Sequence, residues 1–203
     1  MKSSPPPQPF NPNGVPQDME AAATFEQDVH LMLRVREGDE TSFGLLLERY
    51  RGPVVHFLYR MTANQAVSEE LAQEVFLRVY NSRKTYEPAA KFTTWLFRIA
   101  THVALNTLRS RKERPRETLD HELQVADTTY NVEQQLVTNV RVREIRAAID
   151  SLPANQRAAV LMHKYEGLGY AQVSAALSCS ESATKSLLFR AYATLRERLA
   201  HLK

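Results

Sequence analysis

The sequence predicts an all-α protein in which two small helical domains are joined by a flexible acidic linker, the C-terminal domain being a helix-turn-helix. Apolar residues recur at three- and four-residue steps over residues 28–114 and again over 140–202, a spacing typical of amphipathic helices. Between these stretches, residues 117–140 contain five acids, no lysine or arginine, and little periodicity, as linkers do. No alternation of polar and apolar residues is long enough to predict a strand.

The expected boundaries follow from these changes in composition. Residues 1–27 form a tail, 28–114 the first domain, 115–139 the linker and 140–203 the second domain. Six of the ten prolines lie in the first sixteen residues, among Ser, Asn, Gly and Gln, which predicts a disordered tail. Inside the first domain, Gly38, Pro53 and Pro88 are expected to separate helices, because glycine and proline disfavour helix interiors.

The charges are unevenly distributed along the chain. The formal net charge is only +3, but residues 78–116 carry ten bases and two acids, whereas residues 37–74 carry seven acids and three bases. The last 63 residues hold ten bases and five acids. Two basic blocks joined by an acidic linker predict two contacts with one polyanion.

Composition also disfavours several classes of protein. The lone Cys179 excludes a disulfide scaffold and suits a reducing cytosol. No apolar run approaches the length of a membrane helix, and the N-terminus lacks a secretory signal, so we expect a cytoplasmic protein without direct membrane insertion. The six histidines lack metal-ligand spacing, and no phosphate-binding glycine loop or nucleophile motif occurs. We therefore expect no catalytic residue, metal or cofactor.

The stretch KFTTWLFRIA, residues 91–100, begins a helix with two different faces. One face carries Phe92, Leu96, Ile99 and Val103. The opposite face carries Thr94, Arg98, Thr101, His102, Arg109 and Lys112. A basic stripe is commonly a solvated face, but it could also run beside phosphates and release counterions.

Trp95 lies at the border between these two faces. A large aromatic beside an apolar stripe usually belongs to a core. However, Tyr86, Phe92, Trp95 and Phe97 are interleaved with Arg83, Lys84, Lys91 and Arg98. Unstacked bases require aromatic platforms beside charges that hold the backbone, so periodicity alone leaves both interpretations open.

Residues 165–199 have the spacing of a helix-turn-helix, with a short helix at 170–177, a Ser-Cys-Ser turn and a longer helix. Ser180 is one candidate N-cap of the longer helix, and Ser178 with Glu181 also fits a capping box. The residues expected to point outward, toward base edges and phosphates, are Ser182, Lys185, Ser186, Phe189 and Arg190. A helical hairpin that only packs would have the same pattern.

Four stretches together resemble the sigma-70 family of bacterial RNA polymerase initiation factors, in particular its extracytoplasmic-function (ECF) group. They are SEELAQEVFLRVY (68–80), FTTWLFRIATHVALNTLRSRKER (92–114), LPANQRAAVLMHKYEGLGYAQVSAAL (152–177) and ATKSLLFRAYATLRERL (183–199). The resemblance implies a first domain that binds the polymerase clamp and the minus-ten promoter element, and a second that binds the minus-35 element. It also implies two partners, core RNA polymerase and promoter DNA, and related factors are often held by an anti-sigma protein.

The resemblance assigns roles to particular residues. The residues implied in clamp contact are Glu69, Glu70, Gln73 and Glu74. Those implied in minus-ten binding and melting are Tyr86, Lys91, Phe92, Trp95, Arg98, His102, Arg109 and Lys112. An acidic solvated face would look identical to the clamp set. Flipping a base out of the stack costs a few kcal/mol, which aromatic and cationic contacts must offset.

The chain departs from the family pattern at several positions. Leu187 and Tyr192 stand where basic residues are usual in the family. We therefore expect a weaker phosphate grip, with Leu187 or Tyr192 packing instead on a partner or on the preceding helix. Ser178 replaces a common turn glycine, which costs strain if that position needs a positive φ. Val67 stands where an acid is common.

Two other functions agree less well with the sequence. An enzyme is disfavoured because no catalytic constellation occurs. A stand-alone helix-turn-helix regulator would bind an operator tightly by itself, whereas an initiation factor should bind specifically only when polymerase holds its two domains apart.

Overall fold

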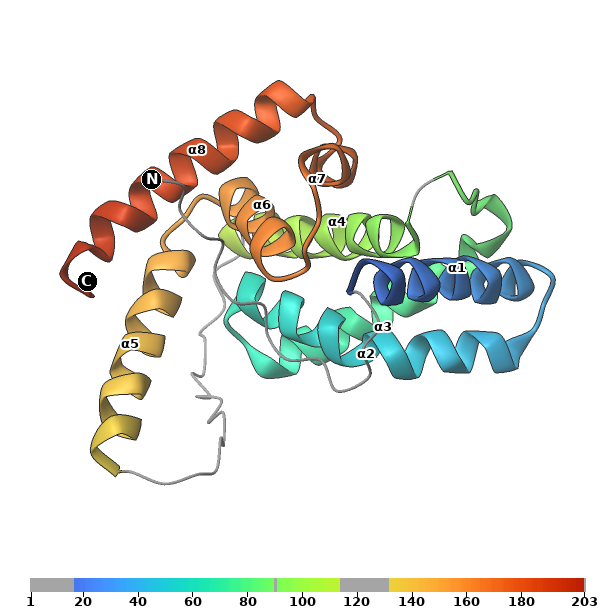
Figure 1. The fold of residues 1–203 in the computed structure, drawn as a ribbon, viewed down its shortest axis with the longest axis horizontal. Coiled ribbons are helices and arrows are strands. Elements are labelled where there is room, and N and C mark those ends of the chain that lie inside the picture. Colours follow the sequence, from blue (N-terminus) through green and yellow to red (C-terminus); the bar gives the residue numbers. More distant parts are fainter. Residues whose placement is uncertain (1–16, 90, 114–131, 203) are drawn as a thin grey trace, which may run out of the picture.

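The computed structural model describes residues 17–89, 91–113 and 132–202; the tail to residue 16 and most of the predicted linker lie outside these ranges. Every regular element in the described ranges is helical, as the fold class predicted. The elements in chain order (Figure 1) are α1 (Gln17–Arg36), α2 (Glu40–Thr62), α3 (Gln65–Asn81), the short η1 (Arg83–Thr85), α4 (Phe92–Glu113), α5 (Val132–Asp150), α6 (Ala154–Lys164), α7 (Tyr170–Leu177), α8 (Glu181–Arg198) and η2 (Ala200–Leu202).

Side-chain caps begin α2 and α3. The Asp39 carboxylate accepts hydrogen bonds from the amides of Thr41 (3.0 Å) and Ser42 (3.2 Å), and the Ser42 hydroxyl donates to its other oxygen (2.9 Å). These bonds, the hydroxyl of Ser42 foremost, lower the pKa of Asp39. Asn64 caps α3 by accepting from the amide of Val67 (3.0 Å). Both caps satisfy amides that a helix start leaves without an intrahelical partner.

Helix boundaries differ from expectation in three places. α1 begins at Gln17, inside the predicted tail, where the sequence QDMEAAATFEQ has high helix propensity. α5 begins at Val132, inside the predicted linker. α2 continues through Pro53 instead of ending there. Proline lacks an amide and disturbs the preceding turn, but Pro53 is exposed, and α2 is anchored on both sides of it by the buried Tyr50 and Val54.

The turn of the helix-turn-helix resolves the two capping alternatives. Ser180 caps α8, its hydroxyl accepting from the amide of Ala183 (3.2 Å). Ser178 ends α7 in the left-handed region, with φ 54°. The strain expected for a non-glycine residue at a positive φ is therefore present at this turn.

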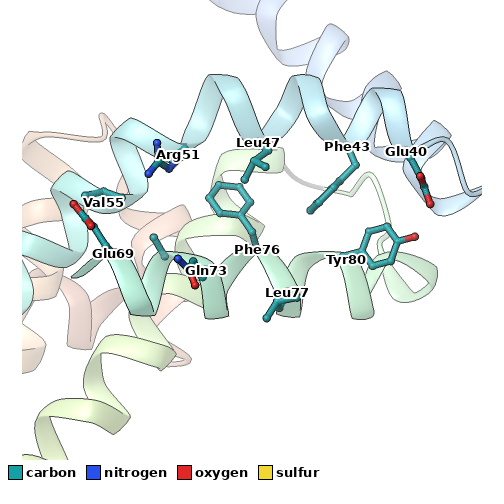
Figure 2. A pocket seen from close by; sticks show the side chains of 11 residues that line it. Glu40, Phe43, Leu47, Arg51, Val55, Glu69, Gln73, Phe76, Leu77 and Tyr80 are labelled. Carbon is teal, nitrogen blue, oxygen red and sulfur yellow. The ribbon is translucent and has the colours of Figure 1, made fainter. Parts of the chain in front are cut away.

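Helices α1 to α4 form one bundle, and α2 and α3 leave a groove along their outer side (Figure 2). None of the helices in the described ranges is both long and apolar enough to cross a bilayer.

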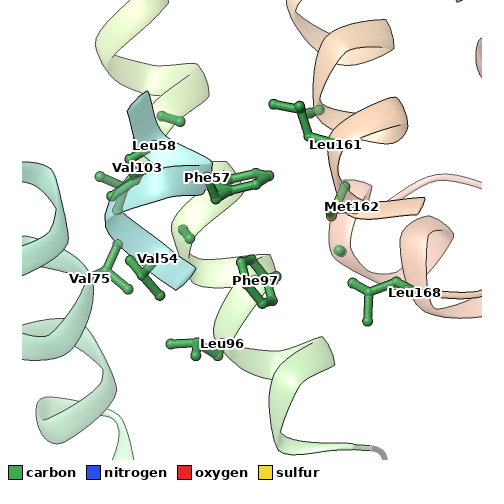
Figure 3. Close-up of a cluster of buried hydrophobic side chains, with 14 of the residues drawn as sticks. Val54, Phe57, Leu58, Val75, Leu96, Phe97, Val103, Leu161, Met162 and Leu168 are labelled. Atoms are coloured by element: carbon green, nitrogen blue, oxygen red, sulfur yellow. The ribbon is translucent and has the colours of Figure 1, made fainter. Parts of the chain in front are cut away.

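The helices α1 to α4 make up the first module and α5 to α8 the second. The two modules share one hydrophobic core. Figure 3 shows Phe57 of α2 and Phe97 of α4 close to Leu161 and Met162 of α6. The Phe57 and Phe97 rings meet edge to face at 5.4 Å. The guanidinium of Arg157 on α6 donates to the carbonyl of Met61 at the end of α2 (2.7 Å). The second module therefore packs directly on the first, an arrangement that the expectation of flexibly tethered domains did not include.

Candidate nucleic-acid and polymerase interfaces

The bases predicted along α4 reach solvent. Lys91, Arg98 and Arg109 are exposed, and His102 is half-buried beside Arg98. Burial lowers the pKa of the His102 imidazole, and the positive charges of Arg98 and Arg78 lower it further, which favours its neutral form. The side chain of Lys112 lies outside the described part of the chain.

The aromatic residues predicted to meet bases occupy different environments. Tyr86 and Phe92 are each only 1% exposed and lie in the core, so in this arrangement neither ring can stack on a base. The burial of Phe92 follows the apolar stripe to which periodicity also assigned it, and the role of Tyr86 and Phe92 in minus-ten binding or melting stays a prediction. Trp95 is partly exposed and packs edge-on against Tyr86, with ring centroids 5.1 Å apart. Trp95 alone among the three is partly exposed.

Two threonines on the predicted basic face are covered by the second module. Thr94 and Thr101 are buried. The Thr94 hydroxyl accepts a hydrogen bond from the Gln172 side-chain amide of α7 (3.0 Å), and the Thr101 hydroxyl lies 3.5 Å from the Met162 sulfur of α6. The face therefore has an open basic part around Arg98 and a covered part beneath α6 and α7.

Helix α8 exposes the residues that its sequence predicted to point outward. Thr184, Leu188 and Ala191 are buried. All five residues predicted to point outward are exposed: Ser182, Lys185, Ser186, Phe189 and Arg190. Phe189 is 76% exposed, an unfavourable position for an aromatic side chain that has no binding partner. Leu187 and Tyr192 pack against the core instead of reaching outward, as their apolar character predicted.

Tyr170, the first residue of α7, is a surface aromatic that the sequence arguments did not single out. Its ring is exposed, stacks at a tilt on His163 with centroids 5.1 Å apart, and lies 5.9 Å from the Lys185 ammonium of α8. Its signal in the sequence was an aromatic at the start of a helix directly after Gly169. Tyr170 thus extends the exposed basic and aromatic surface of α8 onto α7.

The groove between α2 and α3 has a volume of about 620 Å³ and is mainly apolar. Figure 2 shows Phe43, Leu47, Phe76 and Leu77 along it, with Glu69, Gln73 and Arg51 at one end. Of the predicted clamp residues, Glu69 and Gln73 line the groove. Glu70 is exposed outside it, and Glu74 pairs with Arg78 at 2.5 Å.

Leu77 is 63% exposed at this groove and was missed by the sequence arguments, which concentrated on the acids of α3. Its signal was a leucine outside the apolar stripe of its own helix. An exposed leucine beside a hydrophobic groove is typical of a docking surface for another protein.

Comparison with known proteins matches both modules to one family. Sigma-70 region 2 matches residues 46–114, and Sigma-70 region 4 matches residues 142–195. The ECF RNA polymerase sigma factor SigX of Bacillus subtilis is 33% identical over 168 residues, covering 81% of this chain and 87% of SigX. This chain belongs to the ECF sigma factors. The ECF RNA polymerase sigma-E factor of Escherichia coli K12 is 30% identical over 172 residues, covering 81% of this chain and 90% of that protein.

Two solved structures share the fold of this sigma factor at lower identity. CnrH, in complex with the cytosolic domain of CnrY, aligns with a TM-score of 0.64 at 18% identity, covering 86% of this chain and 98% of CnrH. The sigma factor RpoE of Bartonella quintana, in complex with the anti-sigma factor NepR, also gives 0.64, at 19% identity, covering 78% of this chain and 96% of RpoE.

The matched regions place the surfaces of this sigma factor. The region 2 match contains α3, α4 and most of α2, and so Trp95 and all of the groove except Glu40 and Phe43. The region 4 match contains α6, α7 and most of α8. Helix α1 precedes both matches.

Proposed function

We propose that this sigma factor binds bacterial core RNA polymerase and directs it to promoters by contacting the minus-35 and minus-ten elements and helping to separate the strands. The observation that carries the proposal is the presence of regions 2 and 4, in that order, in one chain whose exposed bases lie beside aromatic side chains. The chain supplies binding energy and geometry, while the polymerase performs the chemistry.

Helix α8 is the proposed reader of the minus-35 duplex. A helix in the major groove contacts base edges and phosphates with the residues near its N-terminus. The hydroxyls of Ser182 and Ser186 can bond either, Lys185 and Arg190 supply charge, and Phe189 offers an apolar contact for a thymine methyl. Support comes from the exposure of all five side chains.

Helix α4 is the proposed contact with the minus-ten element. Lys91, Arg98 and Arg109 provide exposed charge along one side of the helix, and Trp95 provides the partly exposed ring at which an unstacked base can rest. Tyr86 and Phe92 support that ring from the core. Their proposed role is therefore indirect.

The groove between α2 and α3 is the proposed polymerase contact. It combines an apolar floor with a polar end formed by Glu69, Gln73 and Arg51. Stable interfaces between proteins have this composition, an apolar centre with a polar rim. The groove is lined by residues of α2 and α3 alone.

Promoter binding by both modules requires their separation. α6 and α7 cover Thr94 and Thr101 on the face of α4 that carries Arg98. We therefore propose that docking on polymerase moves the second module away from α4. Like RpoE of Bartonella quintana, which was solved with NepR, the chain is proposed to have an anti-sigma partner, and its place of action is the cytoplasm.

Run-off transcription with purified sigma factor, bacterial core polymerase and a library of matched genomic fragments tests the function. Transcripts are expected to start at defined sites only when both proteins are present. The matched control combines Lys185→Ala with Phe189→Ala, which removes exposed side chains of α8 without touching the core. This variant should still bind core polymerase but give fewer transcripts from the defined sites. Random starts, or no association with core polymerase, would contradict the proposal.

A further inference from the structure

We infer that Asp28 on α1 is a positioning residue for the aromatic surface at the start of α4, acting through Tyr50 and Phe92 on Trp95. The inference deepens the proposed function, because it rests on the role of Trp95 in promoter melting. Helix α1 precedes both matched regions, so neither match assigns any role to Asp28.

The Asp28 carboxylate is buried and bonded at both oxygens. The residue is 3% exposed. One oxygen accepts from the guanidinium of Arg49 and the other from the hydroxyl of Tyr50, both on α2. Arg49 also donates to the side chain of Gln27 (2.9 Å). A buried carboxylate held by a charged and a neutral donor fixes both partners, because losing either leaves the charge poorly compensated.

The bond from Asp28 orients the Tyr50 ring, and that ring contacts the beginning of α4. Tyr50 is buried and packs at a tilt on Phe92, with centroids 5.3 Å apart. Phe92 in turn lies 6.1 Å from Trp95, one helical turn further along. The contacts therefore run from a carboxylate on α1 to the partly exposed tryptophan without passing through another exposed side chain.

Tyr86 gives a second connection to the same carboxylate. Its ring lies 5.1 Å from Trp95 and 6.3 Å from Phe92. Its hydroxyl is buried and makes no hydrogen bond within the described part of the chain. Burial raises the pKa of Tyr86, and the charge of Asp28 raises it further, so the hydroxyl lies within electrostatic reach of that carboxylate. Asp28 is therefore connected to Trp95 in two ways, through Tyr50 and Phe92 and through Tyr86.

The arrangement explains why a charged group is kept in this core. The ring pairs that hold Trp95 each contribute only about 0.5–1.5 kcal/mol beyond the area they bury. The hydrogen bond from Tyr50 to Asp28 fixes the direction of the Tyr50 ring, which contacts Phe92, the neighbour of Trp95. Without it, the rings retain their hydrophobic contacts but lose their fixed orientation.

Asp28→Asn and Tyr50→Phe test the inference in the full chain, first alone for fluorescence and then assembled with core polymerase for promoter melting. Trp95 is the only tryptophan of this chain, so the intrinsic fluorescence of the chain without polymerase reports on its environment alone. Both variants are expected to shift its emission to longer wavelength and to increase acrylamide quenching. Both should slow open-complex formation, followed by permanganate reactivity, by about two- to tenfold, the range given by loss of one aromatic contact. Binding of the variants to core polymerase and formation of the closed promoter complex should stay unchanged.

Arg34→Ala is the matched control. Arg34 pairs with Asp39 at 2.5 Å and also links α1 to α2, but it does not contact the rings. It should leave both the fluorescence and the melting rate unchanged. If Asp28→Asn fails to fold, Tyr50→Phe still removes the bond while keeping the ring.

Two results would overturn the inference. One is unchanged Trp95 fluorescence and melting in folded variants, and the other is an equal loss of polymerase binding and melting, as general destabilisation would produce. A parallel Trp95→Ala variant separates the two proposals. If it melts promoters normally, the role of Trp95 in the proposed function fails, while the fluorescence shift still tests its positioning by Asp28.

Discussion

The side-chain amide of Gln172 on α7 donates a hydrogen bond to the hydroxyl oxygen of Thr94 on α4, with 3.0 Å between nitrogen and oxygen. The two residues lie in different family regions, and their bond closes the second module over the face of α4 that carries Arg98. The same Gln172 side chain also accepts from the amide of Gly169 (2.8 Å), which fixes its orientation. In the proposed function, this bond is one of the contacts that break when the second module moves away from α4.

Thr94→Val should loosen this contact while leaving the Gln172 cap intact. Valine has nearly the shape of threonine but accepts no hydrogen bond. One net hydrogen bond is worth about 1 kcal/mol, so opening of the interface should become about fivefold more frequent. Hydrogen exchange of α7 amides measures it. Thr93→Val, at the neighbouring half-buried position, is the control, and equal exchange in the two variants would show that the Thr94 bond does not hold the modules together.

Glu166, in the loop before α7, should make stability depend on pH. Burial raises its pKa to about 7, although the charge of Arg60 on α2 acts in the opposite direction. The folded state therefore holds the proton more tightly than the unfolded state does. The free energy of unfolding should fall as pH rises from the unfolded pKa toward and through about 7, and level off above it.

Denaturant titrations between acid and mildly basic pH can check this dependence against Glu166→Gln. Glutamine keeps the shape of the protonated acid without a titrating group. The variant should match the natural protein at low pH and exceed its stability at high pH. Identical curves for the two proteins would refute the assignment to Glu166.

Phe189→Ala should separate DNA binding from folding. Because the side chain is 76% exposed, the free energy of unfolding should change by no more than about 0.5 kcal/mol. Binding of the holoenzyme to promoters with a minus-35 element should weaken about five- to tenfold, as expected for loss of one base contact. Leu188→Ala, at the adjacent buried position, should instead cost about 2–5 kcal/mol of stability. Equal promoter affinity for Phe189→Ala and the natural protein would remove Phe189 from the contact.

Leu77→Asp should block polymerase binding without unfolding the chain. A carboxylate at the edge of the groove would have to be buried without a partner in the complex, and we expect at least about tenfold weaker binding to core polymerase. Leu45→Asp is the matched control, because Leu45 is also exposed, at 48%, but lies outside the groove. Similar losses in both variants would place the polymerase contact elsewhere.

Local rules made the helices and the recognition surface of α8 predictable. The helix-turn-helix depends on apolar spacing and the hydroxyl cap of Ser180, both of which act within a few residues. The outward direction of Lys185 and Phe189 followed from the buried stripe of the same helix. The prediction that a helix ends at Pro53 was wrong, because it used only the local preference of proline. Buried side chains on both sides of Pro53 hold α2 together.

The sequence by itself determined that the chain is helical and which side of α8 is exposed, because each follows from the periodicity of one segment. Only the tertiary structure decided that Tyr86 and Phe92 support Trp95 from the core, and that Thr94 and Thr101 lie beneath the second module. The periodicity of α4 identifies its two faces but not what covers each of them. Burial of one face depends on Gln172 and Met162, which the fold brings against α4 from the far end of the chain.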